Sequence, residues 1–440
     1  MNNDLISSFI NSVWKIIAGP ILLIAIPLFM TSIEQGYWYT FTSIAALAIF
    51  ADLGFTTIIL QFVAHEFAHL RFSENNVIYG DDYHLWRLSS FFRFVLSWLC
   101  KVEMIIFPII LVVGYFFLST KGDNVDWQLP WIIYALSSAA VFFNSALLSF
   151  FEGCNSVGLL QKIRFKISLV STLITLCFLY FGWNIYSLAF SLMGNFFVGQ
   201  FFIIKFFYKP IKQMLFITSS ERYNWWPEFS ALIWRYAISW SSGYLIFQMF
   251  TPLAFFFHGA EFAGKVGISI AMWTAGFTVS NTWMTAINPR LNMLIAMRNW
   301  QELDRIFNQG LIRSMVTMIV GGCGYFIVYF MLAEHVRFFE RVLSPFVMAI
   351  LFISWIMQLY INTLAIYLRA HKKEPLMFLS FISGIYIAIT TFFCAIYFPS
   401  DYLFLGFLSS YAFCLPITYK IWKKQKYAHM KDFNKQEVDE

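Results

Sequence analysis

The sequence contains few charged residues. Asp, Glu, Lys and Arg make up only 12% of its 440 residues, whereas an average soluble domain contains about 25%. Hydrophobic residues account for 59%, and apolar runs long enough to cross a bilayer recur along the whole chain, which is typical of polytopic membrane proteins. A soluble globular fold is therefore not expected, and the composition predicts an all-α polytopic membrane protein.

The sequence also lacks the motifs of common cofactor sites. No glycine-rich phosphate-binding loop is present, which argues against an ATP-driven pump. The six cysteines lie in or beside apolar segments without paired spacing, so we expect neither disulfides nor a cysteine-ligated metal. We expect no cofactor and no catalytic residues. The cysteines are Cys100, Cys154, Cys177, Cys323, Cys394 and Cys414.

The apolar runs predict about twelve membrane spans. These are 11–31, 38–64, 91–118, 131–152, 164–182, 185–207, 231–257, 264–288, 311–333, 345–368, 376–398 and 402–421. Basic residues concentrate in every second loop and in the tail from Lys420 to Lys435, so the positive-inside rule places both termini in the cytoplasm. These inner loops account for the net charge of +6, which gives no reason to expect a nucleic-acid partner.

The loops on the outer side of the membrane are short. They cover about 32–37, 119–130, 183–184, 258–263, 334–344 and 399–401 on these span limits. A membrane polymerase or glycosyltransferase usually needs a sizeable outer loop to carry its acid, base or metal ligands. The short loops therefore argue against this alternative and favour a transporter.

One catalytic pattern is present. The segment HEFAH (His65–His69) fits the H-E-x-x-H signature of zinc proteases. On a helix, His65 and His69 would share a face and Glu66 would act as general base. A catalytic zinc also needs a third ligand, and the nearby segment YGDDYHLW offers several candidates without a known spacing. The alternatives are an intramembrane metalloprotease and ordinary polar residues at the membrane interface.

The two halves of the sequence resemble each other. Ser43–Phe72 in span two and Ser269–Asn299 in span eight both begin with Ser-Ile-Ala and reach a basic residue at a similar distance. This offset of six spans predicts two six-helix bundles related by a pseudo-two-fold axis along the membrane normal, an arrangement known in transporters. We place the first bundle at 1–215, the second at 216–427, and a polar cytoplasmic tail at 428–440.

Polar residues recur at helical spacing inside several spans. Such stripes include Thr278 and Asn281 in span eight, and Gln358 and Asn362 in span ten. A stripe of this kind either makes hydrogen bonds between helices or lines a water-filled cavity. Spans four and seven carry similar stripes, and stripes on four different spans favour the cavity. We therefore predict that Thr278, Asn281, Gln358 and Asn362 contact the substrate.

Ionisable residues also lie within or at the ends of spans, where they generally face a cavity or pair with one another. Lys15 and Arg235 occupy equivalent places near the inner ends of spans one and seven. They either snorkel to the interface or bind an anionic head group such as a phosphate. Lys101 and Glu103 on span three do not share a helix face, so each needs its own partner.

Asp52 lies near the middle of the apolar stretch Ser43–Phe62, directly before Leu53 and Gly54. A carboxylate at this depth costs about 2.5–3.5 kcal/mol to insert. Three roles remain open: a structural cap or an ion pair with Lys101, a proton- or cation-coupling site, and a contact in the cavity. We group Asp52 with Glu103 and Glu152 as ion-coupling or structural charges.

Several segments carry a family resemblance. They are VWKIIAGPILLIAIPLF (Val13–Phe29), EQGYWYTF (Glu34–Phe41), FADLGF (Phe50–Phe55) and AINPRLNMLIAMRNWQELDRIF (Ala286–Phe307). Through them the chain resembles the Wzx-type O-antigen and polysaccharide flippases of the multidrug/oligosaccharidyl-lipid/polysaccharide exporter superfamily. The twelve spans, the inner termini and the short outer loops agree with that family over essentially the whole chain.

The resemblance implies two bundles that open alternately to the two sides of a bacterial inner membrane. The cargo would be an oligosaccharide repeat unit linked through pyrophosphate to undecaprenol, moved to the periplasmic leaflet with a proton or sodium gradient. Membrane lipids and polysaccharide assembly proteins would be further partners. The cationic cavity of the family maps onto Lys15 and Arg235, with Arg290 at its inner mouth. Apart from the resemblance, we also count Lys101 among the predicted substrate contacts. A multidrug or cation antiporter of the same superfamily, which should have a more anionic cavity, is the main alternative.

Overall fold

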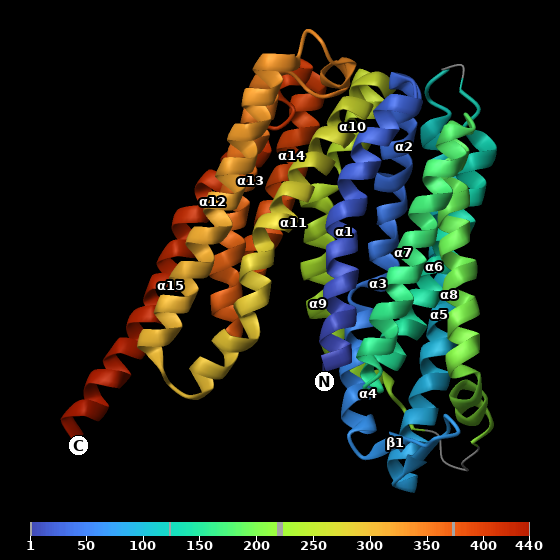
Figure 1. The fold of residues 1–440 in the computed structure, drawn as a ribbon, viewed down its shortest axis with the longest axis vertical. Coiled ribbons are helices and arrows are strands. Elements are labelled where there is room, and N and C mark those ends of the chain that lie inside the picture. The colour runs from blue at the N-terminus through green and yellow to red at the C-terminus, as the bar shows by residue number, and fades with distance from the viewer. Residues whose placement is uncertain (1, 123–124, 218–222, 372–374, 440) are drawn as a thin grey trace. The chain divides into compact units, whose positions relative to one another are not determined.

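The computed structural model describes residues 2–122, 125–217, 223–371 and 375–439, and the side chains of 2–6, 8, 231, 232, 235, 239, 296 and 428–439 lie outside that description. Figure 1 follows the helices from the N-terminus to the C-terminus. In the first part of the chain the elements are α1 (Asn2–Phe29), α2 (Ser32–Ala45), η1 (Ala46–Ala48), α3 (Ile49–Asp52), α4 (Phe55–Phe67), β1 (Leu70–Phe72), β2 (Ile78–Gly80), α5 (Asp82–Leu118), α6 (Gln128–Gly153), α7 (Val157–Tyr180), α8 (Asn184–Phe216) and α9 (Trp226–Phe247). The remaining elements are α10 (Phe250–His258), α11 (Ala260–Ala296), α12 (Trp300–Leu332), η2 (Arg337–Arg341), α13 (Pro345–Ala370), α14 (Met377–Tyr397), η3 (Ser400–Tyr402) and α15 (Leu405–Asp439).

The described residues include ten helices that are long and apolar enough to cross a membrane, and the bent helix from α2 to α4 brings the number to 11. The chain is therefore an all-α polytopic membrane protein, as its composition predicts. The seventh predicted span, 231–257, coincides with α9 and α10. Helix α5 begins at Asp82, well before the predicted start of span three, because the Asp81 side chain caps it by accepting the N–H of His84 at 3.1 Å.

The second predicted span is a broken helix. It runs through α2, η1 and α3, and continues as α4 after a bend of 41°. The break falls at Leu53 and Gly54, which both adopt left-handed conformations with φ angles of 43° and 78°. Glycine adopts this conformation without steric cost, and a Cβ on Gly54 would lie only 2.6 Å from the Cβ of Tyr236 in α9. Gly54 therefore permits both the bend and the close approach of α9.

A short β-hairpin follows α4 where the sequence predicted only a loop. Its strands pair antiparallel, and Asn76 adopts the left-handed conformation in the turn, which asparagine tolerates well. The Asn76 side chain donates a hydrogen bond of 2.5 Å to the carbonyl of Phe206 in α8. Pro210 stands four residues after Phe206 and has no N–H to offer that carbonyl. Asn76 thus satisfies an acceptor that the proline leaves free.

The chain divides into two compact units, Met1–Tyr244 and Leu245–Glu440. The sequence predicted the division at 215/216, so most of α9 belongs to the first unit instead of the second. Contacts of α9 explain the difference. Phe229 is fully buried with its ring 5.2 Å from that of Phe55.

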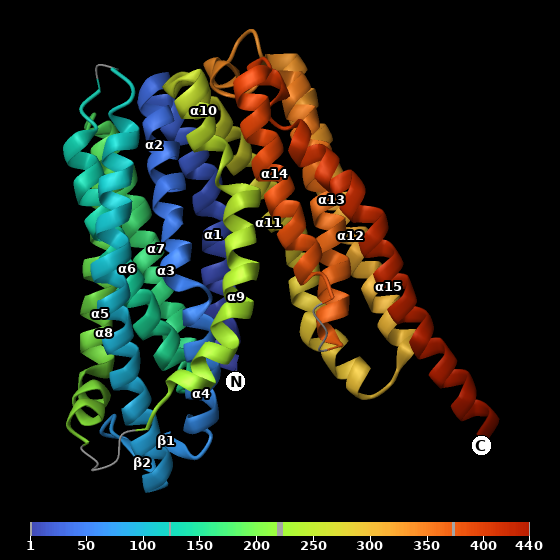
Figure 2. The same cartoon turned by 180° about the vertical axis from the view of Figure 1, so that it is seen from behind.

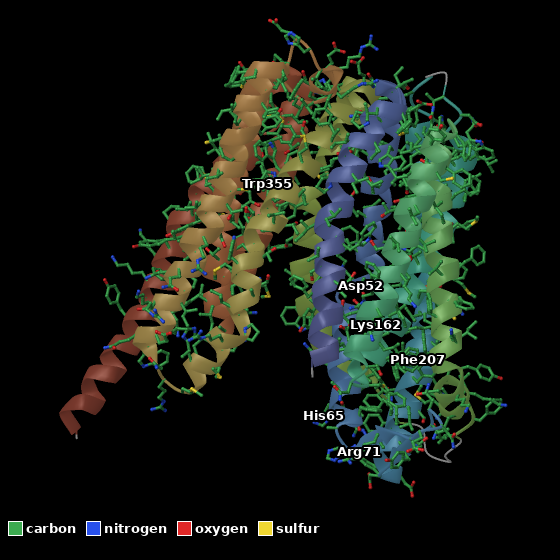
Figure 3. All side chains as sticks on the ribbon, viewed as in Figure 1. Asp52, His65, Arg71, Lys162, Phe207 and Trp355 are labelled. Carbon is green, nitrogen blue, oxygen red and sulfur yellow. The ribbon has the colours of Figure 1, made fainter. Side chains whose placement is uncertain are left out.

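Each unit has its own packed interior. In the first unit Phe151 of α6 stacks on Phe207 of α8, with ring centroids 4.0 Å apart, and Figure 3 labels Phe207 within this unit. The second unit has a cluster that joins α11, α12 and α13, made of Met284, Leu291, Leu294, Leu303, Ile306, Phe307, Leu364 and Tyr367. Since lipid tails are as apolar as these side chains, such packing acts mainly through close van der Waals contact.

Candidate functional site

Asp52 makes the hydrogen bonds of a helix cap. Its Oδ1 accepts the backbone N–H of Thr56 at 2.9 Å, and its Oδ2 accepts the Thr56 hydroxyl at 3.1 Å. The first turn of a helix has N–H groups without intrahelical acceptors, and the buried carboxylate satisfies one of them just after the break. Lys101, its predicted partner, is exposed and makes no ion pair with Asp52 in the described part of the chain. Of the three roles left open by the sequence, the geometry favours the structural cap.

The H-E-x-x-H segment forms a polar junction at the end of α4. The Glu66 side chain is 4% exposed, and its carboxylate lies 2.8 Å from Nδ1 of His84 and 2.9 Å from Nε of Arg87. His65 is exposed (Figure 3), and His69 stacks on His84 instead. A zinc protease needs both histidines on the metal and its glutamate free to act on water. Because Glu66 is occupied by Arg87 and His84, the geometry does not support the metalloprotease alternative.

Arg87 also holds the segment that leads into α9. Its guanidinium carbon lies 4.5 Å from the ring centroid of Tyr223 and 4.9 Å from that of Trp225. The Tyr223 hydroxyl donates a hydrogen bond to the carboxylate of Glu228, which raises the pKa of the Tyr223 phenol. These contacts give the junction a structural task, which is to fix the start of α9 on the first unit.

Glu152 is paired with a neighbouring helix. Arg164 of α7 holds its carboxylate with two hydrogen bonds, from Nη2 at 2.5 Å and from Nη1 at 3.1 Å. Forked pairs of this kind are among the stronger charge-assisted hydrogen bonds. The carboxylate of Glu152 therefore carries no uncompensated charge in this arrangement.

Beside this pair lies a polar cavity of about 410 Å³ in the first unit. Its walls come from α1, α6, α7 and α8, and nine of its 13 described lining residues are Ser, Thr, Asn or Arg. The lining residues are Leu22, Val141, Asn144, Ser145, Leu148, Arg164, Ile167, Ser168, Ser171, Thr172, Thr175, Ser191 and Asn195. A cavity of this size lies in the range of ligand pockets, roughly 300–1,000 Å³.

Several groups in the cavity wall have unused hydrogen-bonding capacity. Asn144 is 3% exposed, and its Nδ2 donates to the carbonyl of Phe196 at 2.9 Å, while its Oδ1 has no partner among the described residues. Thr172 and Thr175 donate their hydroxyl protons to carbonyls of their own helix at 2.9 and 3.0 Å. Their hydroxyl oxygens keep free lone pairs, so this wall is rich in acceptors for water or a polar ligand.

The cavity face of α7 was not among the predicted stripes. Arg164, Ser168, Ser171 and Thr175 recur at steps of four, three and four residues, which is the same kind of signal that marks spans eight and ten. The spacing alone could have identified it.

In the second unit, three of the predicted polar residues come together. Asn362 of α13 donates a hydrogen bond of 2.9 Å to Asn281 of α11. Gln358 and Asn362 also line a cavity of about 110 Å³, together with Arg369. The bond between Asn362 and Asn281 joins two helices, which was the alternative to a cavity-lining role. Asn362 does both, since it bonds Asn281 and also lines the small cavity.

Thr278 belongs to an exposed polar face of α11. Thr274, Thr278 and Thr282 are all exposed, and each donates its hydroxyl proton to a carbonyl one turn earlier in the helix. Back-bonding of this kind satisfies the donors and leaves the oxygens outward. The second unit therefore presents a hydroxyl-lined helix face together with its small cavity.

The remaining predicted site residues lie apart from these cavities. Arg290 is exposed and lies 3.2 Å from the Glu302 carboxylate, which also binds Arg305. Lys15 is exposed on α1. Glu103 has a buried Oε1 without a hydrogen-bond partner among the described residues. The side chain of Arg235 lies outside the described residues.

Each cavity combines hydroxyl and amide groups with one arginine, Arg164 in the first unit and Arg369 in the second. None of the described residues that line either cavity is a carboxylate. Such linings can replace the hydration of a polar or anionic ligand. They lack the paired acid and base of a hydrolytic or transfer reaction.

No protein-family model matches the sequence, and no curated protein matches it. Solved structures, in contrast, match it over nearly its whole length. A multidrug resistance MATE family transporter of the MOP superfamily, in an inward-facing conformation, aligns with a TM-score of 0.58 and 12% identity over 93% of this chain and 99% of its own. A MATE protein in complex with MaL6 aligns with a TM-score of 0.57 and 12% identity over 97% of both chains.

A third match is a MOP superfamily transporter from Pyrococcus furiosus, for which a binding pocket of reverse polarity and a different function are suggested. It aligns with a TM-score of 0.55 and 12% identity over 97% of this chain and 95% of its own. At this identity the likeness shows the fold alone. The chain has the fold of the MATE transporters, which confirms the predicted fold class.

Proposed function

We propose that this protein is a secondary transporter that moves an organic solute across a membrane by alternating access. The observation that carries the proposal is the match of its fold to MATE transporters over 93–97% of its length. Because the sequence has no nucleotide-binding loop, an ion gradient would supply the energy. The positive-inside rule supports a cytoplasmic location for both termini, and we retain the bacterial inner membrane as the proposed site.

The first candidate cargo class is that of a multidrug or cation antiporter. Among the structural neighbours, one is itself a multidrug resistance transporter, so the comparisons support this class better than they support a flippase. Apolar drugs could also use the many aromatic side chains of the chain, since 21% of its residues are Phe, Trp or Tyr. The charges of the cavities fit this candidate less well. A cation site gains most from carboxylates in its walls, and the described residues that line the two cavities include none.

The second candidate is the lipid-linked oligosaccharide flippase, and the cavity linings favour it. The two cavities offer arginine, amide and hydroxyl groups without a lining carboxylate. Arg164 already uses one N–H of each terminal nitrogen on Glu152. Its remaining donors would contact a phosphate, while hydroxyl and amide groups replace the hydration of sugars. The carboxylates of Asp52 and Glu152 are occupied by Thr56 and Arg164. An undecaprenyl-pyrophosphate-linked oligosaccharide would therefore find suitable partners in these walls.

For this second candidate we retain the predicted contacts as proposals. Lys15, Arg235 and Lys101 would supply positive charge, and Arg290 would attract the cargo at the inner mouth. The polar contacts would be Thr278, Asn281, Gln358 and Asn362.

Reconstitution into vesicles distinguishes the candidates. Purified protein would be placed in liposomes with an imposed proton or sodium gradient, and three probes would be compared: a fluorescent lipid-linked oligosaccharide, a fluorescent organic cation, and a fluorescent phospholipid as the control for scrambling. Gradient-dependent movement of the oligosaccharide supports the flippase, and movement of the cation alone supports the antiporter. A lengthened glycan would instead indicate a polymerase. Failure of all gradient-dependent movement would contradict the transporter proposal.

The predicted role of Arg235 gives a sharper test of the flippase. Arg235→Ala should lower oligosaccharide transport more than Arg235→Lys does, because lysine keeps the charge but loses the planar fork. Arg305→Ala is a matched control, since Arg305 is exposed and bound to Glu302. Normal transport by a well-expressed Arg235→Ala protein would remove this residue from the site.

A further inference from the structure

The turn of the β-hairpin and the second half of α8 line an open cavity of about 510 Å³ that is separate from the two cavities described above. Its described lining residues include two ammonium groups and one carboxylate. Its lining residues are Glu74, Asn75, Asn76, Ile204, Lys205, Phe206, Tyr208 and Lys209. Figure 2 shows the hairpin strand β2 at one end of the first unit.

The cavity has a rigid frame. Gln213 of α8 accepts the N–H of Ile78 at 2.8 Å and donates to its carbonyl at 2.7 Å, so it pairs with β2 as an additional strand residue would. Asn76 adds the bond to the carbonyl that Pro210 leaves free. Lys209 donates from Nζ to the carbonyl of Asn75 at 3.1 Å. Four contacts therefore fix the hairpin against α8 and hold the walls of the cavity in place.

Its depth matches the membrane interface. Lys205 stands 21 residues after Asn184, the first residue of α8, which is about 31 Å along a helix at 1.5 Å per residue. The hydrocarbon core of a bilayer is about 30 Å thick. If α8 enters the bilayer near its first residue, Lys205 and Lys209 lie at the level of the lipid head groups on the opposite side.

An apolar stripe leads along α8 to these lysines. Phe197, Phe201, Ile204 and Tyr208 follow at steps of four, three and four, and their side chains are 50–59% exposed. Since about half of each side chain is exposed in the described part of the chain, this helix face is available to lipid acyl chains. Lys205 lies over the rings of Phe201 and Phe206, with Nζ 5.9 and 5.7 Å from their centroids. It has no acidic partner among the described residues.

We propose that this cavity binds the head group of an anionic phospholipid, whose acyl chains lie along the exposed face of α8. The phosphate lies between Lys205 and Lys209, which are one helical turn apart. The Tyr208 hydroxyl and the Asn75 amide supply further hydrogen bonds to the head group. This site does not depend on the cargo of the transporter.

The charges of the cavity select the kind of lipid. Lys205 and Lys209 against Glu74 leave one net positive charge, so a head group with one net negative charge compensates it. Phosphatidylglycerol carries that charge. Phosphatidylcholine has no net charge, so we expect it to bind weakly.

Native mass spectrometry of the purified full chain, titrated with phosphatidylglycerol or phosphatidylcholine, tests the site. We expect Lys205→Ala/Lys209→Ala to weaken phosphatidylglycerol binding at least about tenfold. Lys205→Arg/Lys209→Arg should retain it. The matched control is Lys423→Ala/Lys424→Ala in α15, because Lys423 is also exposed and lies 5.9 and 5.6 Å from the ring centroids of Tyr419 and Tyr427. This control should bind as the wild type does.

A second variant keeps the test decisive if the alanine variant misfolds. Glu74→Gln removes the only carboxylate among the described residues that line the cavity and should strengthen phosphatidylglycerol binding. The proposal is overturned if this variant has no effect, if phosphatidylcholine binds as tightly, or if the α15 control loses the lipid equally. It is also overturned if inorganic phosphate displaces the lipid at equal concentration, since the acyl stripe would then contribute nothing.

Discussion

Two segments of the chain begin with the same residues and fold differently. Ser43–Phe72 and Ser269–Asn299 both open with Ser-Ile-Ala. The first segment breaks at Leu53 and Gly54, whereas α11 continues for 37 residues even though it contains Pro289. The difference follows from the residues after the shared opening, because only the first copy has the Asp-Leu-Gly sequence.

The comparison shows two ways to place polar groups within a membrane span. In the first copy the helix opens, and the Asp52 carboxylate satisfies the N–H of Thr56 that the break leaves free. In the second copy the helix stays closed, and its threonines return their protons to their own backbone. The first device gives a bend and a contact with α9, and the second gives an uninterrupted helix with an oxygen-lined face.

Substitution of the two glycines should give the largest contrast. Gly54→Ala combines a left-handed φ with a close contact to Tyr236, and we expect it to cost about 2–4 kcal/mol of stability. Gly276→Ala in α11 would meet only the Met318 sulfur at 3.7 Å, so it should leave thermal unfolding in detergent unchanged or raise its midpoint. Equal effects of the two substitutions would show that the break at Gly54 is not fixed by backbone strain.

Removal of the cap should have the next largest effect. Asp52→Ala leaves the Thr56 N–H without its acceptor and should destabilise the protein by about 1–2 kcal/mol. Asp52→Asn keeps an acceptor oxygen and should cost less. Thermal unfolding would be measured beside gradient-driven transport. If Asp52→Asn unfolds like the wild type but loses the dependence on the gradient, Asp52 is a coupling site and not only a cap.

The hydroxyl groups of the two units can then be compared by isosteric substitution. Thr172→Val/Thr175→Val removes two acceptors from the cavity of the first unit, and we expect about fivefold slower transport, equivalent to about 1 kcal/mol. Thr278→Val/Thr282→Val on α11 should have a smaller effect, because its oxygens lie on an open face. The control is Thr42→Val. The Thr42 hydroxyl donates to the carbonyl of Tyr39 at 2.8 Å, and Thr42 belongs neither to the described lining of the first-unit cavity nor to the threonine face of α11. A larger loss from the α11 pair would shift the main contact to the second unit.

The smallest effect should come from Arg290→Gln. Arg290 is exposed and shares Glu302 with Arg305, so solvent and salt screen the interaction. We expect an unchanged unfolding midpoint and a slower transport rate only at low ionic strength, where long-range attraction of an anionic cargo counts most. A large loss at high salt would instead indicate direct contact with the cargo.

Much of the fold could be predicted from the sequence, because apolar runs and charge asymmetry report directly on membrane spans. The break at Asp52 was also within reach, since glycine and a carboxylate in one span indicate freed backbone groups. The docking of α9 on the first unit could not be predicted, because it depends on Phe229 and Tyr236 meeting residues more than 170 positions away. The residue pattern of one segment contains no information on which distant segment it will contact.

The candidate site was predictable only in part. The stripes contain Asn281 and Asn362, and these two are hydrogen-bonded to each other, while their contact with the substrate stays a prediction. The stripe on α7 carried the same spacing and was missed. The partner of Arg164 could not be predicted, because a salt bridge between two helices depends on their rotation about their own axes, which spacing along one helix does not determine.

The bond between Asn76 and Phe206 also bears on how the chain is assembled. Its two residues are separated by 130 positions in the sequence, so the hairpin leaves the ribosome long before the carbonyl that will receive it. A nascent chain that stops short of α8 has a hairpin with no surface to dock on. Pro210 leaves the Phe206 carbonyl free for Asn76. The hairpin after the second membrane segment can therefore dock only once α8, the sixth segment, has been synthesised.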